Sequence, residues 1–231
     1  MKRFSLLSVQ VILFTLAFQS CSNSKFLAAD FDSKTANHKR IAILPVETVL
    51  SGNQPKKLNA AQIKSIEEAE SKAFQTSLYN CLLKKSGSGK KDIKIEIQPI
   101  EKTNSLLAGA GIDIRRAWTL ESEELCKKLG VDAIVKTKVE KTRYLSDLAS
   151  YGISVGQDIL LALTDYAVWP FMPSGMAKTN DIKSECSVLN GSDGSLLWRV
   201  AVQTETDWSQ PSNQIIDDLN RKFARNFPYK K

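Results

Sequence analysis

The sequence predicts a single α/β (α+β) domain with a mixed, mostly five-stranded sheet that is packed by helices. The segment "RIAILPVE", 40–47, is a continuous apolar run with the length of a strand buried on both faces. Apolar residues then recur at helical spacing over 59–85. Residues 181–208 contain two strand-like runs joined by a turn. This mixture of strand and helix patterns is typical of a layered domain.

The predicted helix over 59–85 has recognisable ends. Asn59, followed by Gln62 three residues later, is an N-terminal capping pattern. Lys84 and Lys85 suit the negative end of the helix dipole, and Gly87 is expected to end the helix. The apolar stripe consists of Ile63, Ile66, Ala69, Ala73, Leu78 and Leu82.

The segment "DIKIEIQPI", 92–100, alternates strictly between apolar and polar residues, which predicts a strand with one solvated face. Pro99 cannot donate to a strand ladder, so this strand is expected near an edge of the sheet. The inward side chains are Ile93, Ile95 and Ile97, and the outward ones are Lys94, Glu96 and Gln98.

A short helix with a loop is predicted over 103–118, and a second helix ends in "ELCKKLGVD". Leu125 and Leu129 form its apolar face, and Gly130 is expected to cap it. A strand then begins at Asp132 and continues past Val139.

The last part of the chain predicts a β-hairpin followed by a helix. Asp193-Gly194 lies in the turn 190–194 between the two strand-like runs and favours a hairpin there. The closing helix, 211–227, has one apolar stripe. It consists of Ile216, Leu219, Phe223 and Phe227. The predicted order is therefore β-α-β-α-β-insert-β-β-α.

The N-terminus is typical of an export signal. Lys2 and Arg3 precede an apolar run over 4–18, which is shorter than the roughly 20 residues needed to span a bilayer. The run ends at Ser20-Cys21, which resembles a bacterial lipobox. That resemblance implies cleavage before Cys21 and acyl chains on Cys21. We expect a signal peptide at 1–20, a lipid-anchored tether at 21–39 and the α/β domain at 40–231.

Composition argues against several classes of function. The 32 basic and 25 acidic residues give +7, and removing the two basic residues of 1–20 leaves only +5. The basic residues form no stripe with interleaved aromatics, so no nucleic-acid partner is expected. His38 is the single histidine, which argues against histidine-based catalysis, and "SGSGKK", 86–91, lacks the spacing of a phosphate loop. No catalytic residue, metal or cofactor is expected.

Once Cys21 carries lipid, three cysteines remain, namely Cys81, Cys126 and Cys186. They allow at most one disulfide, and the sequence leaves open whether any two of them pair. No C-x-x-C motif is present.

The insert at 151–178 is the most apolar stretch after the signal peptide and is predicted to be helical. Trp169, Phe171 and Met172 form an aromatic tip beyond its helical part. They are candidate partner-binding residues, and the alternative is that they belong to the core. Asp158 and Asp165 argue against a membrane-spanning helix.

Three segments carry a resemblance to a known group: "RIAILPVE", "ELCKKLGVDAIVKTKVE" and "LNGSDGSLLWRV". They resemble the periplasmic lipoprotein domains related to the TolB N-terminal domain, LpoB and the globular part of CsgG. The resemblance implies the fold and a location in the cell envelope, with the outer membrane expected. It transfers no functional residue.

These observations together predict a lipid-anchored, non-enzymatic protein of the cell envelope. It is expected to be held to the membrane by lipid on Cys21 and to bind an envelope protein or other envelope partner; the oligomeric state stays open. Two alternatives are a subunit of a secretion or pore assembly, as in the CsgG resemblance, and a hydrolase of envelope substrates.

Overall fold

The computed structural model describes residues 23–52, 58–87, 89, 92–145, 153, 156, 178–207 and 210–230. The elements follow one another in the order β1 (Asn23–Leu27), α2 (Phe31–Thr35), β2 (Arg40–Ile43), β3 (Glu47–Leu50), α3 (Ala60–Leu83), β4 (Glu96–Ile97), α4 (Ile100–Gly109), α5 (Ile114–Thr119), α6 (Ser122–Leu129), β5 (Ala133–Lys141), β6 (Lys178–Asn190), β7 (Leu196–Asp207) and α8 (Ser212–Asn226).

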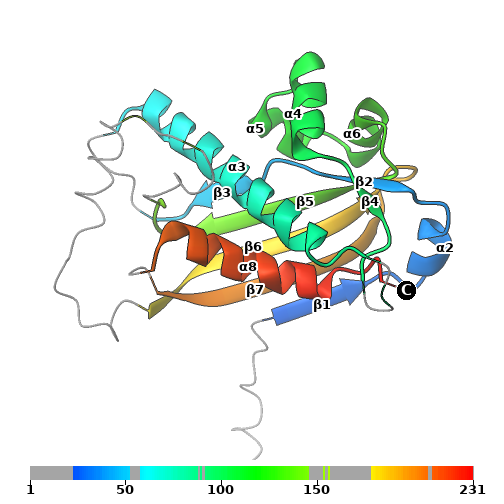
Figure 1. The fold of residues 1–231 in the computed structure, drawn as a ribbon. Helices are drawn as coiled ribbons and strands as arrows, with labels where there is room; N and C mark the ends of the chain where they lie inside the picture. Colours follow the sequence, from blue (N-terminus) through cyan, green and yellow to red (C-terminus); the bar gives the residue numbers. More distant parts are fainter. Residues whose placement is uncertain are drawn as a thin grey trace, which may run out of the picture.

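The described strands form one mixed sheet of seven strands in the order β1-β7-β6-β5-β2-β4, with β3 also paired to β5 (Figure 1). The β2–β4, β2–β5 and β3–β5 pairs are parallel, whereas β5–β6, β6–β7 and β1–β7 are antiparallel. The predicted fold class and the single domain are confirmed. The sheet has two strands more than expected, because β1 and β3 were not predicted as separate strands.

Helices cover the two faces of the sheet unequally. In Figure 1, α3 and α8 lie across one face, and the Asn220 side-chain amide donates to the Phe74 carbonyl at 3.0 Å to join them. Helices α4, α5 and α6 pack on the other face, over β2 and the start of β5. The alternation of each strand explains the two cores, since Ile41 and Ile43 belong to the first and Ala42 to the second.

The predicted caps are present in the two helices where they were expected. Asn59 and Gln62 form a complete capping box at the start of α3. Gly130 follows α6 in the left-handed conformation, with φ 66°, where a glycine avoids the cost of a Cβ. Leu125 and Leu129 are buried, as their spacing predicted.

The hairpin and the closing helix are also confirmed. Strands β6 and β7 are paired, and the turn between them has Gly194 at φ 64°. Trp198 of β7 is only 4% exposed and packs edge-on against Phe227, with ring centroids 5.5 Å apart. The α8 stripe that begins at Ile216 and Leu219 faces the sheet and is buried.

Residues 23–39 differ from the expected tether. Asn23–Leu27 form β1, which pairs along its whole length with β7, and Phe31–Thr35 form α2. Phe31 is buried, and its ring lies 5.4 Å from that of Tyr229. Among the described residues, the folded part therefore already includes 23–39, ahead of the expected start at residue 40.

The segment 92–100 forms less strand than its alternation predicted. Only Glu96 and Ile97 join the ladder, as β4 at the edge of the sheet. The three isoleucines are buried as expected, whereas the outward prediction for Gln98 is wrong. Its amide donates to the Leu129 carbonyl at 3.0 Å and accepts from Thr103 at 2.9 Å, and these bonds allow it to be buried.

Candidate functional site

The predicted site residues Cys21, Trp169, Phe171 and Met172 lie outside the described residues. The helix predicted within 151–178 lies outside them as well. Of that insert the structure describes residues 153, 156 and 178, and the half-buried Ile153 packs against the core. The structure does describe the chain directly after Cys21 and the chain that leads into the insert. The first place is an edge strand with exposed apolar side chains, and the second follows a buried ion pair.

The chain after Cys21 enters the sheet almost at once. Ser22 alone separates Cys21 from Asn23, the first residue of β1. β1 is an edge strand whose one side is bonded to β7, and no described strand pairs with its other side. Phe26 and Leu27 of this strand are 43% and 56% exposed. The position at which the sequence predicts a lipid is therefore two residues from an edge strand in the sequence.

A buried ion pair holds the chain at the end of β5, which precedes the insert. The Lys141 ammonium, at the end of β5, lies 2.7 Å from the Glu70 carboxylate of α3, and the Leu145 backbone N–H donates to the same carboxylate at 2.7 Å. The Lys141 ammonium also lies 4.6 Å from the centre of the Tyr144 ring. These contacts hold residues 144–145 against the core, and residues 146–150 separate them from the insert at 151–178.

Burial controls the electrostatics of this pair. The pKa of Glu70 is raised because its complete desolvation outweighs the attraction of Lys141 and the backbone hydrogen bond. The sequence analysis assigned no role to Glu70 or Lys141. The two-residue alternation of β5 could have indicated that Lys141 lies on the core face. The buried positions of this strand alternate from Val135 to Lys141, which places Lys141 on that face.

A broad cleft of about 800 Å³ lies where α3, α8 and the end of β7 meet. Several polar contacts organise it: Ser77 donates to Asp217 at 2.5 Å, and Lys222 donates to Thr204 at 3.2 Å. The charged side chains along it are Lys84, Lys85, Arg221, Lys222, Arg225, Asp207, Asp217 and Asp218. Such a mixed-charge surface suits a polar or macromolecular ligand.

The described cysteines provide no reactive thiolate. Cys81, Cys126 and Cys186 are all free and buried, which answers the open question of their pairing. Burial raises the pKa of Cys126 and of Cys186 to about 12, and it also raises the pKa of Cys81, which lines the cleft. These groups are thiols at neutral pH, and a thiol is a weak nucleophile.

His38 has a structural position. Its Nδ1 lies 2.8 Å from the Tyr229 hydroxyl, and partial burial lowers its pKa, so the ring is neutral at pH 7. In the part of the chain that the structure describes, no cluster of His, Cys, Asp and Glu side chains is arranged to hold a metal ion. Within the same residues, no helix has both the length and the apolar character needed to cross a bilayer.

Comparison with known proteins identifies similar folds only. No protein-family model matches the chain, and no curated protein matches it. One similar solved structure is the PelC dodecamer from Paraburkholderia phytofirmans, with 9% identity over 88% of this chain and 94% of that chain, and a TM-score of 0.41. Another is lipoprotein GNA1162 from Neisseria meningitidis, with 10% identity over 81% of this chain and 96% of that chain, and a TM-score of 0.43.

A third similar structure is the C-terminal domain of LpoB from Escherichia coli. It shares 9% identity over 84% of this chain and 94% of that chain, with a TM-score of 0.36. LpoB, which the sequence motifs resemble, is thus one of the solved structures with a similar fold. At these identities the similarity concerns the arrangement of helices and strands.

Proposed function

We propose that this chain is a lipid-anchored, non-enzymatic protein of the cell envelope. Acyl chains on Cys21 hold it to the outer membrane, and its domain binds a protein or other envelope partner. The observation that carries this proposal is the basic start and short apolar run of 1–20, ending at Ser20-Cys21 directly before the folded domain. More than one acyl chain gives a stable anchor, whereas a single chain gives a marginal one.

A binding role agrees with the chemistry of the described side chains. The thiols are protonated, and the single histidine is neutral and bonded to Tyr229. The cleft beside α8 offers polar and charged groups for recognition. Trp169, Phe171 and Met172 are the proposed partner-binding residues, because an exposed aromatic tip is a natural contact surface.

Mass spectrometry of the protein purified from membranes tests the anchor. The wild-type protein should begin at Cys21 and carry acyl groups, whereas Cys21→Ser should keep its signal peptide and lose the acyl mass. Cys81→Ser is the matched control, because Cys81 is a free buried cysteine and its replacement should leave the acyl mass in place. An unmodified Cys21 in the mature wild-type protein would disprove the anchor.

A further inference from the structure

The open edge of β1 combines features that are rare on this domain. Ser24, Lys25, Phe26 and Leu27 are all exposed. Phe26 and Leu27 are adjacent, and in the described residues Leu83 is the other large apolar side chain with comparable exposure. An apolar edge strand without a neighbour attracts other surfaces, so proteins usually cover or protect it. This edge therefore requires a specific covering surface.

The distance to the anchor identifies that surface. Two peptide units separate Cys21 from Asn23, so their Cα atoms are at most about 7 Å apart. If acyl chains on Cys21 enter the bilayer, the start of β1 must lie at the headgroup layer. This step rests on the proposed lipidation of Cys21.

The register of β1 determines how the domain meets the bilayer. Phe26 is opposite Arg199 in the ladder, and Leu27 is opposite Trp198, so the two apolar side chains point to opposite faces of the sheet. A domain lying on either face would bring only one of them to the membrane. An edge-on orientation brings both of them to it.

We propose that the domain stands edge-on on the membrane, with β1 in the headgroup layer and Phe26 and Leu27 entering the interface on either side of it. The charges on this edge are suitable. Lys25 projects from β1 itself, and Arg199 lies beside Phe26 in the next strand. The Lys25 ammonium attracts anionic headgroups while its stem covers apolar surface, and the exposed Arg199 guanidinium, which also lies 3.9 Å from the Glu185 carboxylate, adds to this attraction.

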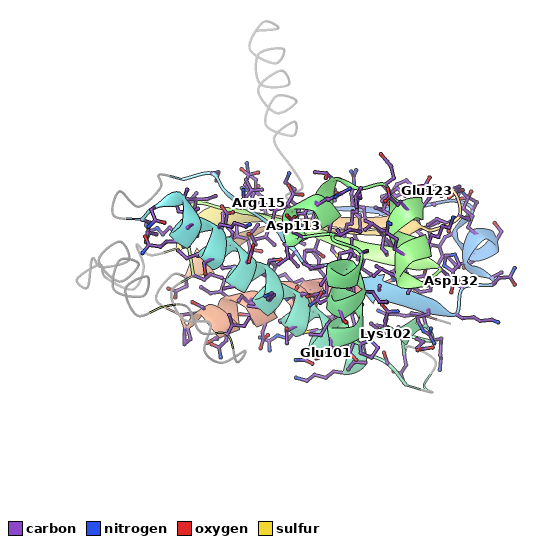
Figure 2. The ribbon with its side chains drawn as sticks, turned by 90° about the horizontal axis from the view of Figure 1, so that it is seen from above. Glu101, Lys102, Asp113, Arg115, Glu123 and Asp132 are labelled. Atoms are coloured by element: carbon purple, nitrogen blue, oxygen red, sulfur yellow. The ribbon has the colours of Figure 1, made fainter. Side chains whose placement is uncertain are left out.

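In this orientation, each successive strand of the sheet from β1 to β4 lies farther from the membrane surface. β4 lies five strand positions from β1, which corresponds to about 24 Å at the usual strand spacing. Helix α4 follows β4 and packs beside β2, on the part of the domain most distant from β1 (Figure 1). Glu101, labelled on α4 in Figure 2, is exposed and provides a position remote from the membrane.

Spin labels on the full-length lipidated protein test this orientation. We would label Phe26→Cys, Leu27→Cys and the control Glu101→Cys separately, in vesicles of phosphatidylethanolamine and phosphatidylglycerol. Collisions with oxygen report the apolar interface, and collisions with a water-soluble nickel complex report water. The native cysteines are buried, and the unsubstituted protein measures any residual labelling. The acyl mass on Cys21 is measured on the same samples.

Both β1 labels should gain oxygen collisions and lose nickel collisions when the protein is bound to vesicles, while the label at Glu101→Cys should stay in water. Protection at only one of positions 26 and 27 would overturn the edge-on orientation. Dipolar broadening between β1 labels of two molecules would show that a second copy covers the edge, which also overturns it. Acylated protein with both labels in water refutes the inference alone, whereas missing acyl mass refutes the proposed anchor as well.

Discussion

The carboxylate of Glu70 and the ammonium of Lys141 lie 2.7 Å apart in the interior, where the side chains are 0% and 1% exposed. Both groups are shielded from water, so each depends on the other, and the Glu70 carboxylate also accepts a hydrogen bond from the Leu145 N–H. The pair joins α3 to the end of β5. Through the Leu145 N–H it also fixes the described residues directly after β5 against α3.

Removing one partner of this pair should destabilise the domain strongly. Lys141→Met removes the counter-ion of the buried Glu70, which must then either remain charged without a partner or take up a proton, and such a loss typically costs about 3–5 kcal/mol. Urea unfolding measures this loss. Lys64→Met, which removes an exposed pair with Glu68, is the control and should change the unfolding free energy by less than about 1 kcal/mol. Equal effects of the two changes would contradict the role assigned to the buried pair.

The stability of Lys141→Met should also depend on pH. Lys141 lowers the pKa of Glu70, so its loss raises further a pKa that burial already holds above the ordinary value of 4.5. Between 4.5 and the raised pKa, the folded state keeps a proton that the unfolded state releases. The unfolding free energy of the variant should therefore fall as pH rises from 4.5 toward neutrality.

The double variant Glu70→Gln, Lys141→Met provides the control for this titration, because position 70 then has no carboxyl group. The pH dependence specific to Lys141→Met should disappear from it. If both variants respond equally to pH, another group causes the effect.

In the structure, residues 23–39 belong to the folded domain, and their contribution to its stability can be measured. A chain that begins at Arg40 lacks β1 and α2, including Phe31, which is 7% exposed. Loss of a buried phenylalanine alone typically costs about 3–5 kcal/mol. Chains that begin at Asn23 and at Arg40 should therefore differ by at least that amount in urea unfolding. Equal stability would mean that 23–39 behave as the tether expected from the sequence.

The sequence was most informative where a local pattern determines a local structure. The capping residues Asn59 and Gln62, the left-handed Gly130 and the turn at Gly194 all act over a few residues, and each is found as predicted. Strand β1 could not be predicted in the same way. Its side chains are exposed on both faces, so it has no apolar alternation, and its pairing with β7 depends on residues about 175 positions away.

The same reasoning explains what was missed in the interior. Glu70 interrupts the apolar pattern of α3 and was therefore assigned no role, although it is completely buried. Only its partner from β5 explains that position, and the partner is distant in sequence. Gln98 is a similar case, since its hydrogen bonds to Leu129 and Thr103 compensate for burial that its polarity alone argued against.

The turn at Gly194 offers a test of backbone conformation. Its φ of 64° is costly for any residue with a Cβ, and a Cβ there would also approach the Glu123 carboxylate at 2.6 Å. Gly194→Ala should therefore lower the unfolding free energy by about 1 kcal/mol or more.

Gly109→Ala is the matched control, because Gly109 ends α4 and a Cβ there meets nothing within 4 Å. It should be neutral or slightly stabilising, since alanine favours a helix more than glycine does. A neutral result at both glycines would indicate that the turn has another conformation in solution.

The last prediction concerns Trp169, whose role as a partner-binding residue is a proposal from the sequence. Trp198 is the internal reference: it is 4% exposed, and Trp198→Ala should cost about 3–5 kcal/mol of stability. Pro170 and Pro173 cannot continue a helix without losing backbone hydrogen bonds, so the chain should leave any packed element near Trp169. Trp169→Ala should therefore cost little stability and should reduce co-purification of an envelope partner from detergent extracts. If Trp169→Ala destabilises the domain as much as Trp198→Ala does, Trp169 belongs to the core and the partner contact must lie elsewhere.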